Sequence, residues 1–443
     1  MPTMKRLLAI LLLFLPLTIA QAQVLDIGLV VGNESALPIA VVPMPYTGSN
    51  LKPDTDVAGV IRDDLNRSGQ FRSVPVDTIR GFFADKPMPT RGSEVKFSDW
   101  KLLKQDFVVV GRVIDESDGG YRVEYELYDV AKQQRLIGLF DSGRGKGLRD
   151  VSHRIADQIY EKILGVRGAF WTRIAYVTAT GLGQSMQYSL MVADSDGYGP
   201  QTVVKSREPL LSPAWSPDGR KLAYVSFERG NSTVYSQEII TGAREVIASF
   251  KGINGAPSFS PDGRRLALTL SKSGNPEIYV MDLTSKSLTQ ITHHFGIDTE
   301  ATWTPDGQNL IFTSDRAGKP QVYQVAASGG EPTRLSFAGD SNAKASVSYD
   351  GKKIAMAQGS GNVYRIAVLD RSFGGTGRWQ TLSPGNLDES PSFAPNASML
   401  LYATKEGRKG VLYAVSADGR VRLRSTVSDG DVREPAWSPY RQR

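Results

Sequence analysis

The amino-acid sequence predicts a two-domain protein, in which a small N-terminal α/β domain is followed by a six-bladed β-propeller closed by the C-terminal strand. Three observations indicate this fold. A turn motif recurs at a fixed interval through the second part of the chain, the strands that flank it complete a closed ring, and the first third of the chain mixes helical and strand periodicities. A fixed period of about 20 to 50 residues is typical of a solenoid, a propeller or an array.

The repeat is organised around the turn Ser216-Pro217-Asp218-Gly219. Proline presets φ at the second turn position, aspartate bonds to the local backbone, and glycine accepts the positive φ at the exit. An aromatic-containing strand precedes five of the six turns, an apolar strand follows the turn, and two further strands lead to the next copy. Four strands in about 44 residues are typical of one propeller blade. Equivalent turns begin at Ser260, Thr304, Ser348, Ala394 and Ser438.

The count of strands predicts how the ring closes. The strand before the turn occurs six times, and its last copy is Pro435-Ala436-Trp437-Ser438 at the C-terminus. The strand after the turn also occurs six times, but its first copy, Arg173–Val177, has no such turn before it. Residues 174–205 therefore supply three strands of one blade and the C-terminus supplies the fourth. A propeller over residues 168–443 would leave no open edge at this seam.

Residues 1–22 have the pattern of a secretory signal. Lys5 and Arg6 precede an apolar run of 14 residues, and Ala20-Gln21-Ala22 is a small-residue cleavage site. Cleavage after Ala22 is expected to release a mature chain that begins at Gln23 into the periplasm. The sequence has no cysteine, so no disulfide supports the fold. No second apolar segment long enough to span a membrane is expected in the mature chain.

Two segments lie between the signal and the propeller. Residues 23–37 are expected to be an N-terminal arm, either an edge strand or a mobile extension. Residues 38–165 are expected to form the α/β domain. Its expected elements are strand Pro38–Pro43, helix Asp56–Asn66, strand Phe71–Val74, a short helix capped by Ser98 and ending near Lys104, strands Phe107–Ile114, Tyr121–Val130 and Arg135–Phe140, and helix Leu148–Leu164.

The sequence offers little chemistry for an active site. It has three histidines. His153 lies in the last predicted helix and is interpreted as a surface or interface side chain. His293 and His294 are interpreted as a loop pair, because a metal site needs further ligands. Nucleophile-elbow, P-loop and His-Glu-x-x-His motifs are absent from the sequence. The 52 Lys and Arg residues are scattered among 46 Asp and Glu residues, which argues against a nucleic-acid partner.

Polar residues precede the innermost strands of successive blades, where they are expected to meet at one mouth of the central channel. A ring of carboxylates there can hold a cation such as Ca²⁺ or meet the donors of a partner. The alternative interpretation is that these are ordinary polar turn residues. The segments are Asn254-Gly255-Ala256, Asp298-Thr299-Glu300, Asp340-Ser341-Asn342, Asp388-Glu389 and Asp431-Val432-Arg433-Glu434.

With these features in place, the chain resembles the TolB family, the periplasmic propeller proteins of the Tol–Pal envelope system of Gram-negative bacteria. The likeness covers nearly the whole mature chain in order. The Pro-Asp-Gly turns occur in many propellers, whereas the domain order, the link and the ending together are specific. The segments that carry the resemblance are Pro38–Pro43, Val108–Gly111, Lys162–Phe170, Ser195–Tyr198, Leu211–Gly219, Asn254–Gly263 and Pro435–Tyr440.

The resemblance implies a non-enzymatic adaptor that supports outer-membrane integrity and invagination during cell division. It implies that the propeller mouth binds the peptidoglycan-associated lipoprotein Pal. Ala256 and Thr299 match positions at which the family contacts Pal, whereas Ile253 stands where the family usually has histidine. The implied Pal-binding residues are Ile253, Asn254, Gly255, Ala256, Asp298, Thr299, Glu300, Asp388, Glu389 and Glu434.

The resemblance also implies that the mature N-terminal strand binds the C-terminal domain of TolA, an inner-membrane protein. In the family the arm either docks between the domains or is released, and Pal favours the docked state. Alternate apolar residues in the arm suit strand addition to a sheet edge. The implied TolA-binding residues are Gln23, Val24, Leu25, Asp26, Ile27, Gly28, Leu29, Val30 and Val31.

No cofactor is required by this interpretation, although the resemblance implies that the channel can hold Ca²⁺. The ligands expected for it are Asp298, Glu300 and Asp388, because Ca²⁺ prefers carboxylate oxygens. A monomer is expected, and a bacteriocin that uses the Pal site is a further candidate partner.

Two other classes of function stay open at this point. A lactonase-like propeller hydrolase would use channel calcium held by convergent Glu, Asn and Asp side chains. A carbohydrate-binding scaffold is the other alternative. Proteases of the prolyl-oligopeptidase type also carry such propellers, but they need a catalytic domain with a nucleophile elbow, which is not expected because the sequence stops at Arg443.

Overall fold

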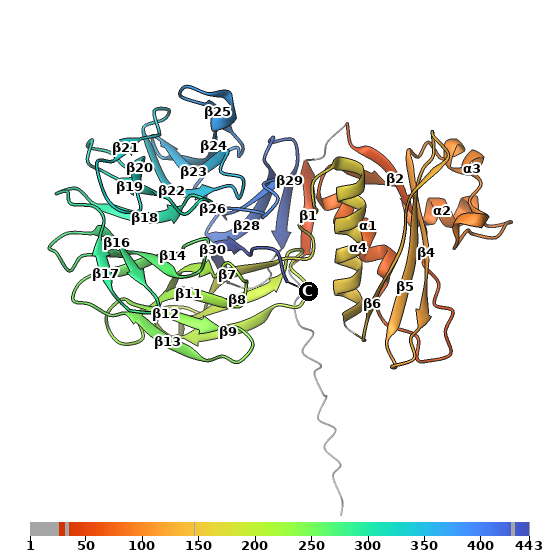
Figure 1. Cartoon of the computed structure of the whole chain (residues 1–443), viewed down its shortest axis with the longest axis horizontal. Helices are drawn as coiled ribbons and strands as arrows, with labels where there is room; N and C mark the ends of the chain where they lie inside the picture. The colour runs from red at the N-terminus through yellow and green to blue at the C-terminus, as the bar shows by residue number, and fades with distance from the viewer. Residues whose placement is uncertain (1–25, 32–34, 146, 427–429, 443) are drawn as a thin grey trace, which may run out of the picture.

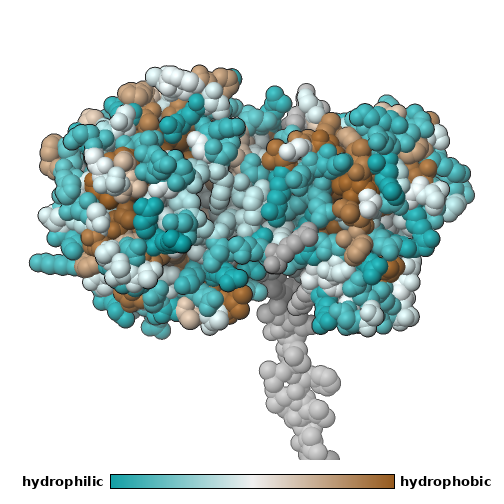
Figure 2. All heavy atoms as spheres, viewed as in Figure 1, coloured by the Kyte–Doolittle hydropathy of each residue, from teal (hydrophilic) through white to brown (hydrophobic). Residues whose placement is uncertain are grey.

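A computed structural model of the chain describes residues 26–31, 35–145, 147–426 and 430–442. It has two domains, an α/β domain and a β-propeller, which lie side by side (Figure 1). The fold class expected from the sequence is therefore confirmed. On the face shown in Figure 2, hydrophobic residues are scattered among hydrophilic ones over both domains.

The α/β domain is built on a five-stranded sheet in the order β3-β2-β4-β5-β6. β2 is parallel to β3 and β4, whereas β4, β5 and β6 form an antiparallel meander. The strands are β2 (Leu37–Val41), β3 (Phe71–Ser73), β4 (Phe107–Asp115), β5 (Tyr121–Asp129) and β6 (Gln134–Gly143).

Helices cover both faces of this sheet. α1 (Val57–Arg67) and α4 (Gly147–Leu164) bury Ile61 and Ile155 in the core on one face. α2 (Val76–Phe82) and α3 (Phe97–Leu102) bury Ile79 and Trp100 on the other. Figure 1 shows α4 on the side of the domain that faces the propeller. The apolar residues of α4 recur every fourth position, so one stripe of the helix packs on the sheet.

Three details of this domain differ from the sequence prediction. Asp56, expected as the first residue of its helix, is instead the N-cap of α1 and accepts a hydrogen bond from the Gly59 N–H at 3.0 Å. Ser98 does not cap α3, because that helix begins one residue earlier, after Lys96, whose side chain makes no capping bond. α2 was not expected, since seven residues give too few turns for a periodic pattern.

The propeller has six blades in the part of the chain that the structure describes. Each blade is an antiparallel sheet whose first strand lies at the channel and whose fourth lies outside. The strands of blades two to four are β10 (Leu210–Trp215), β11 (Lys221–Ser226), β12 (Thr233–Glu238), β13 (Arg244–Ala248), β14 (Asn254–Phe259), β15 (Arg265–Leu270), β16 (Glu277–Asp282), β17 (Leu288–Gln290), β18 (Asp298–Trp303), β19 (Asn309–Ser314), β20 (Gln321–Ala326) and β21 (Thr333–Arg334). Those of blades five and six are β22 (Ser341–Val347), β23 (Lys353–Ser360), β24 (Val363–Asp370), β25 (Arg378–Thr381), β26 (Glu389–Phe393), β27 (Met399–Glu406), β28 (Lys409–Ser416) and β29 (Arg422–Thr426).

The recurring turn is held by one side chain. The Ser216 hydroxyl donates to Asp218 Oδ1 at 2.5 Å and accepts from the Lys221 N–H at 2.9 Å. Gly219 has a φ of 68°. The same serine or threonine to aspartate bond is present in the turns that begin at Ser260, Thr304 and Ser348. The motif recurs along the chain because the same bond closes the turn in these blades.

Blade one is completed by the C-terminus. Its order is β30-β7-β8-β9, with β7 (Arg173–Thr180), β8 (Gln187–Asp194), β9 (Gln201–Ser206) and β30 (Asp431–Trp437). Trp437 pairs with Ile174, and its indole N–H donates to Thr172 Oγ1 at 2.9 Å. The predicted closure is thus confirmed.

The N-terminal arm adds a fifth strand to blade six. β1 (Asp26–Val31) pairs antiparallel with β29, with Asp26 opposite Thr426 and Leu29 opposite Leu423. Figure 1 places β1 between the propeller and α4. This position makes Asp26–Val31 an edge strand, one of the two alternatives for the arm, whereas Gln23, Val24 and Leu25 lie outside the described residues.

Across the ranges that the structure describes, none of the helices combines the length and the apolar composition needed to cross a membrane.

We expect the closure seam to limit the stability of the propeller. Trp437→Ala removes a packed indole and its hydrogen bond to Thr172, so it should lower the free energy of unfolding by about 3 to 5 kcal/mol. Denaturant unfolding of the mature chain would measure this. Phe295→Ala is the control, because Phe295 is 87% exposed and its loss should change the free energy by less than about 0.5 kcal/mol. Equal effects of the two substitutions would contradict the role of the seam.

Candidate functional site

The innermost strand of every blade carries a β-bulge at the same place. At each bulge the strand register shifts and one non-glycine residue has a φ between 44° and 57°. A bulge with a left-handed residue re-aims the side chain and bends the strand. The six residues, one per blade, are Ser212, Ala256, Glu300, Lys344, Ser390 and Glu434; we call them the bulge residues.

Bulge residues of different blades contact one another. Lys344 Nζ donates to Ser390 Oγ at 3.0 Å and to Glu434 Oε1 at 3.2 Å. Glu300 Oε2 accepts the backbone N–H of Lys344 at 3.2 Å. These bonds join blades four, five, six and one, so this side of the channel is a linked polar network.

A cavity of about 470 Å³, which we call the mouth cavity, opens beside this network and is lined by residues of blades four, five, six and one. Its wall is formed by both charged and apolar side chains. Its volume falls within the usual range for a ligand site. Charged residues in the wall are Glu300, Lys344, Asp388, Glu389, Lys405 and Arg433.

Several of the residues predicted to bind Pal are accessible near the bulges. Ile253 is 50% exposed, and Gly255, Ala256 and Thr299 are half-buried. Thr299 Oγ1 shares a hydrogen bond of 3.2 Å with Thr269 Oγ1. Glu389 and Glu434 are also half-buried. These positions fit a surface that a partner can reach, and their role in binding stays a prediction.

Three other residues of the predicted Pal site are buried and already engaged. The Asn254 side chain bonds to both backbone groups of Phe250, at 2.7 and 2.8 Å. Asp298 pairs with Arg316 at 2.8 Å. Asp388 accepts from Ser383 Oγ at 2.5 Å. The alternative interpretation was that these are ordinary polar turn residues. It is the better one for these three residues, because buried polar groups need internal partners.

The three predicted calcium ligands do not come together. Within the described ranges, the group of His and carboxylate side chains whose ligand atoms all lie within 4.8 Å of one another is Asp64, His153 and Asp196. It contains none of Asp298, Glu300 and Asp388. Asp298 Oδ1 is buried without a hydrogen bond, but the other oxygen of this carboxylate is bound to Arg316. A calcium site made from these three carboxylates is therefore not assembled.

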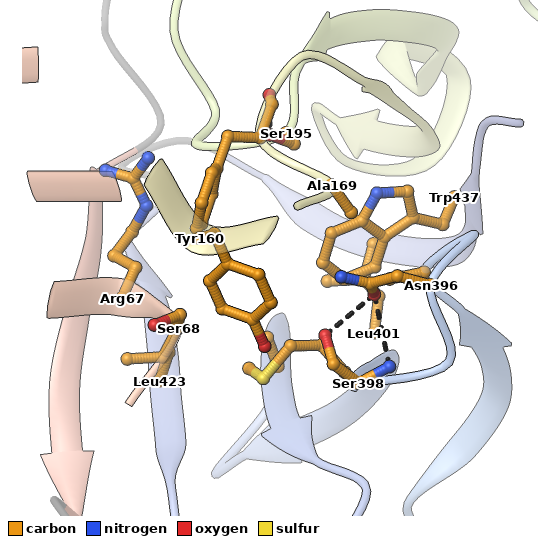
Figure 3. Close-up of a pocket in the computed structure, with 14 residues that line it drawn as sticks. Arg67, Ser68, Tyr160, Ala169, Ser195, Asn396, Ser398, Leu401, Leu423 and Trp437 are labelled. Atoms are coloured by element: carbon orange, nitrogen blue, oxygen red, sulfur yellow. Dashed lines mark hydrogen bonds between the residues drawn. The ribbon is translucent and has the colours of Figure 1, made fainter. Parts of the chain in front are cut away.

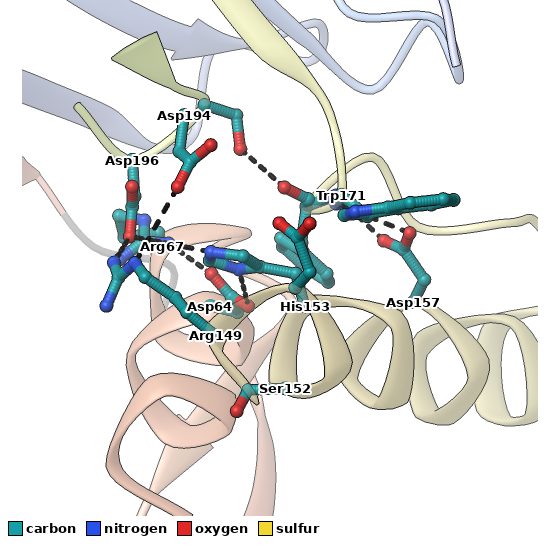
Figure 4. A network of polar contacts seen from close by, with 12 residues as sticks. Asp64, Arg67, Arg149, Ser152, His153, Asp157, Trp171, Asp194 and Asp196 are labelled. Atoms are coloured by element: carbon teal, nitrogen blue, oxygen red, sulfur yellow. Dashed lines mark hydrogen bonds and ion pairs between the residues drawn. The ribbon is translucent and has the colours of Figure 1, made fainter. Parts of the chain in front are cut away.

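A second polar network lies between the two domains (Figure 4). His153 of α4 is 1% exposed, and its Nδ1 lies 2.6 Å from Asp64 Oδ2 of α1. Its Nε2 lies 4.0 Å from Asp196 Oδ2 of the propeller. Arg67 pairs with Asp64, and Arg149 pairs with Asp196. His153 is thus an interface residue, one of the two alternatives for it, and it is not at the surface.

The charged side chains of this network shift the pKa values of its buried members. The carboxylates of Asp64 and Asp196 oppose the desolvation of the buried imidazole and raise the pKa of His153 above its usual value. Asp196 itself has a lowered pKa, because Arg67, His153 and Arg149 outweigh the effect of its burial. Two arginines and one imidazolium therefore balance the carboxylates of Asp64, Asp194 and Asp196. The network holds the domains together best when His153 carries its proton.

Asp157 adds a contact between α4 and the link to the propeller. Its carboxylate accepts the N–H of Phe170 at 2.7 Å and that of Trp171 at 3.4 Å. Burial raises the pKa of Asp157 to about 7. At the C-terminus, Arg441 pairs with Asp150 of α4 at 2.8 Å. The link to the propeller and the C-terminal segment are therefore both tied to α4.

The gap between the domains contains a small cavity (Figure 3). Tyr160 and Phe170 line it from one side, and Leu401, Leu423 and Trp437 line it from the propeller. Its volume of about 40 Å³ has room for a few water molecules but not for an organic substrate. This site fits a domain interface and offers no chemistry of its own.

Two functional features were missed in the sequence. The bulge residue of blade five is Lys344, which lies 44 residues after Glu300, whereas the segment chosen in that blade was Asp340-Ser341-Asn342. Strict use of the period would have found Lys344. The partners of His153 lie 89 and 43 residues away in the chain, and no local pattern connects them.

Comparisons with known proteins agree with this architecture. Two family profiles match, one described as the TolB amino-terminal domain over residues 25–136 and one as the TolB beta propeller domain over residues 160–441. The Tol-Pal system protein TolB of Xanthomonas oryzae pv. oryzae (strain PXO99A) is 69% identical over 439 residues, which cover 99% of this chain and 98% of that protein.

Two further proteins show the same likeness. The Tol-Pal system protein TolB of Xanthomonas campestris pv. campestris (strain B100) is 68% identical over 439 residues, with 99% of this chain and 98% of that protein covered. The crystal structure of TolB from Acinetobacter baumannii superposes with a TM-score of 0.84 at 43% identity, and covers 94% of this chain and 100% of that chain.

The interdomain network predicts that stability falls as the pH rises through neutrality. A group whose pKa is raised on folding contributes stability below its unfolded pKa, about 6.5 for histidine, and loses it as the pH passes the folded pKa. Asp157 acts in the same direction through its pKa of about 7. The thermal midpoint of the mature chain should therefore decrease as the pH rises from about 6.5 through neutrality.

His153→Gln should reduce this pH slope, whatever it does to the absolute midpoint. His294→Gln is the matched control, because the imidazole of His294 lies in a propeller loop and its Nδ1 accepts a hydrogen bond from the nearby Gly296 N–H. A slope that is unchanged by His153→Gln would show that the network does not titrate as argued.

Proposed function

The chain belongs to the TolB family, and from this premise we propose that it is a non-enzymatic periplasmic adaptor of the Tol-Pal envelope complex. It binds the lipoprotein Pal at the mouth of the propeller and the C-terminal domain of TolA through its N-terminal arm. By linking these partners it supports outer-membrane integrity and the invagination of the envelope during cell division.

One observation carries the proposal. The arm strand β1 and the innermost strand β26 belong to the same five-stranded sheet, in the order β1-β29-β28-β27-β26. Glu389, a predicted Pal contact, lies in β26 and lines the mouth cavity. A partner at the mouth therefore touches the inner strand of the sheet whose outer edge holds the arm. This continuity supports coupling between the two binding events.

The docked arm is suited to act as a switch. Its backbone pairs with β29 from Asp26 to Val31, so one of its edges is already satisfied by hydrogen bonds within the chain. An extended partner adds to a sheet through the same backbone groups. TolA would then compete with β29 for the arm, and a partner that stabilises the docked state would weaken TolA binding by the same free energy.

The alternative functions gain no comparable support. A lactonase-like hydrolase needs convergent ligands for a channel calcium, whereas Asp298 and Asp388 are each bound to a side chain of the protein. No observation on the described residues favours a carbohydrate ligand. A bacteriocin that uses the mouth remains a candidate partner on the same grounds as Pal.

Deletion of residues 23–33 should abolish binding of the TolA C-terminal domain. The reason is that the deletion removes the strand that is proposed to pair with the partner. The variant should stay folded and should still bind the soluble domain of Pal, because β29 keeps its pairing with β28. Calorimetric titration of the mature chain and the deletion variant with each partner tests this. Retention of TolA binding would place the TolA site elsewhere.

Ala256→Tyr should weaken Pal at least about tenfold, or about 1.4 kcal/mol, because it fills space at the mouth. The left-handed backbone should tolerate the change, since equivalent positions hold Glu300 and Lys344. Ser212→Tyr is the matched control, with the same bulge conformation at a position outside the predicted contacts. Titration with the soluble domain of Pal measures both. Equal affinities for Ala256→Tyr and the unaltered chain would move the Pal site away from Ala256.

A further inference from the structure

The channel contains a cation that belongs to the protein. Lys344 is the bulge residue of blade five. Its ammonium donates to Ser390 Oγ at 3.0 Å and to Glu434 Oε1 at 3.2 Å. The side chains of Lys344 and Glu434 are only 29% and 17% exposed. The ammonium therefore bridges side chains of blades six and one, and most of the Lys344 side chain is buried.

Carboxylates surround this ammonium on several sides. Glu434 contacts it directly, and Glu300 and Glu389 act on it at longer range. Together they raise the pKa of Lys344 in spite of its desolvation, so the side chain is charged at neutral pH. Glu300 is fixed by the Lys344 N–H and by the Thr313 hydroxyl, each at 3.2 Å. The positive charge is therefore placed where the anionic groups of the channel converge.

The oxygen atoms near Lys344 do not form a coordination site for a calcium ion. Ca²⁺ takes about six to eight oxygen ligands at about 2.3 to 2.6 Å. Ser390 Oγ and Glu434 Oε1 already accept hydrogen bonds from the ammonium. Asp298 and Asp388, expected to be ligands, are bound to Arg316 and Ser383. A divalent ion would also be repelled by the fixed ammonium at short range.

We propose that Lys344 is the resident cation of the propeller channel and takes the place that a divalent cation would otherwise have. The channel of this chain consequently binds no Ca²⁺. Glu300, Ser390 and Glu434 form a cation site that becomes available to a divalent ion when the ammonium is removed. This inference does not depend on Pal or TolA, since it concerns only side chains of the channel.

Direct titration with Ca²⁺ tests the inference. Calorimetry on the chelator-treated mature chain should give no saturable heat up to about 1 mM Ca²⁺, the weak end of the range for extracellular calcium sites. Lys344→Gln removes the charge and adds an amide oxygen, and it should give one-to-one binding with a dissociation constant of order 10⁻⁴ M. The double variant Lys344→Gln with Glu434→Gln should lose that binding.

Two further variants keep the result interpretable. Lys405→Gln removes the same charge from the wall of the mouth cavity, outside the contacts of Glu434 and Ser390, and should bind no Ca²⁺. Lys344→Ser repeats the test with the residue that the bulges of blades two and six already hold. A rise of the thermal midpoint with added Ca²⁺, present in either Lys344 variant and absent from the unaltered chain, is the second readout.

Saturable Ca²⁺ binding by the unaltered chain below about 1 mM would overturn the proposal, because the channel would then accept both cations. Failure of both Lys344 variants to bind Ca²⁺ would overturn it as well, since Lys344 would not be what excludes the ion. Binding by Lys405→Gln equal to that by Lys344→Gln would show that net charge alone, and not the place of the ammonium, controls the channel.

Discussion

Ring closure is the constraint on which the rest of this structure depends. The C-terminal strand β30 pairs with β7, so the two ends of the propeller satisfy each other and all six innermost strands surround one channel. A closed ring forces the equivalent residues of each blade to the same height. The left-handed bulge recurs in every blade, and its side chain therefore becomes part of one shared environment. Side chains 44 to 134 residues apart, such as Glu300, Lys344 and Glu434, meet for this reason.

This shared environment decides which charges the channel tolerates. Carboxylates that converge in a partly desolvated space repel one another unless a cation lies between them. In this chain one bulge position supplies that cation as Lys344, while three others carry serine or alanine. The polar residues just before the bulges have a different task. Asn254 and Asp298 are buried and bind loops of their own blade or the preceding one, so they stabilise the blade and leave the channel to the bulge residues.

The sequence was sufficient for the fold and only partly sufficient for the site. The period of the Pro-Asp-Gly turns predicted the blades, because each turn is closed by bonds within a few residues, such as that from Ser216 to Asp218. The strand count predicted the closure. The buried ion pairs could not be predicted, because Asp298 with Arg316 depends on how a loop folds back, and His153 with Asp64 depends on how two helices pack. Spacing alone indicates that two polar residues share a face. It does not indicate whether a third residue already forms a hydrogen bond or an ion pair with them.

The domain interface adds a last step to the argument about coupling. Gly69, just after α1, has a φ of 68°, and a Cβ there would lie 2.1 Å from Val421 Cγ2 of the propeller. Val421 directly precedes β29, the strand that holds the arm. The end of α1 thus rests against the same edge that the arm occupies, and Arg67 of α1 belongs to the interdomain charge network. A change in how the domains pack would alter the edge available to β1, and arm release would alter the packing in turn. Under the proposed function, the protonation of His153 and the docking of the arm would therefore favour the same closed arrangement.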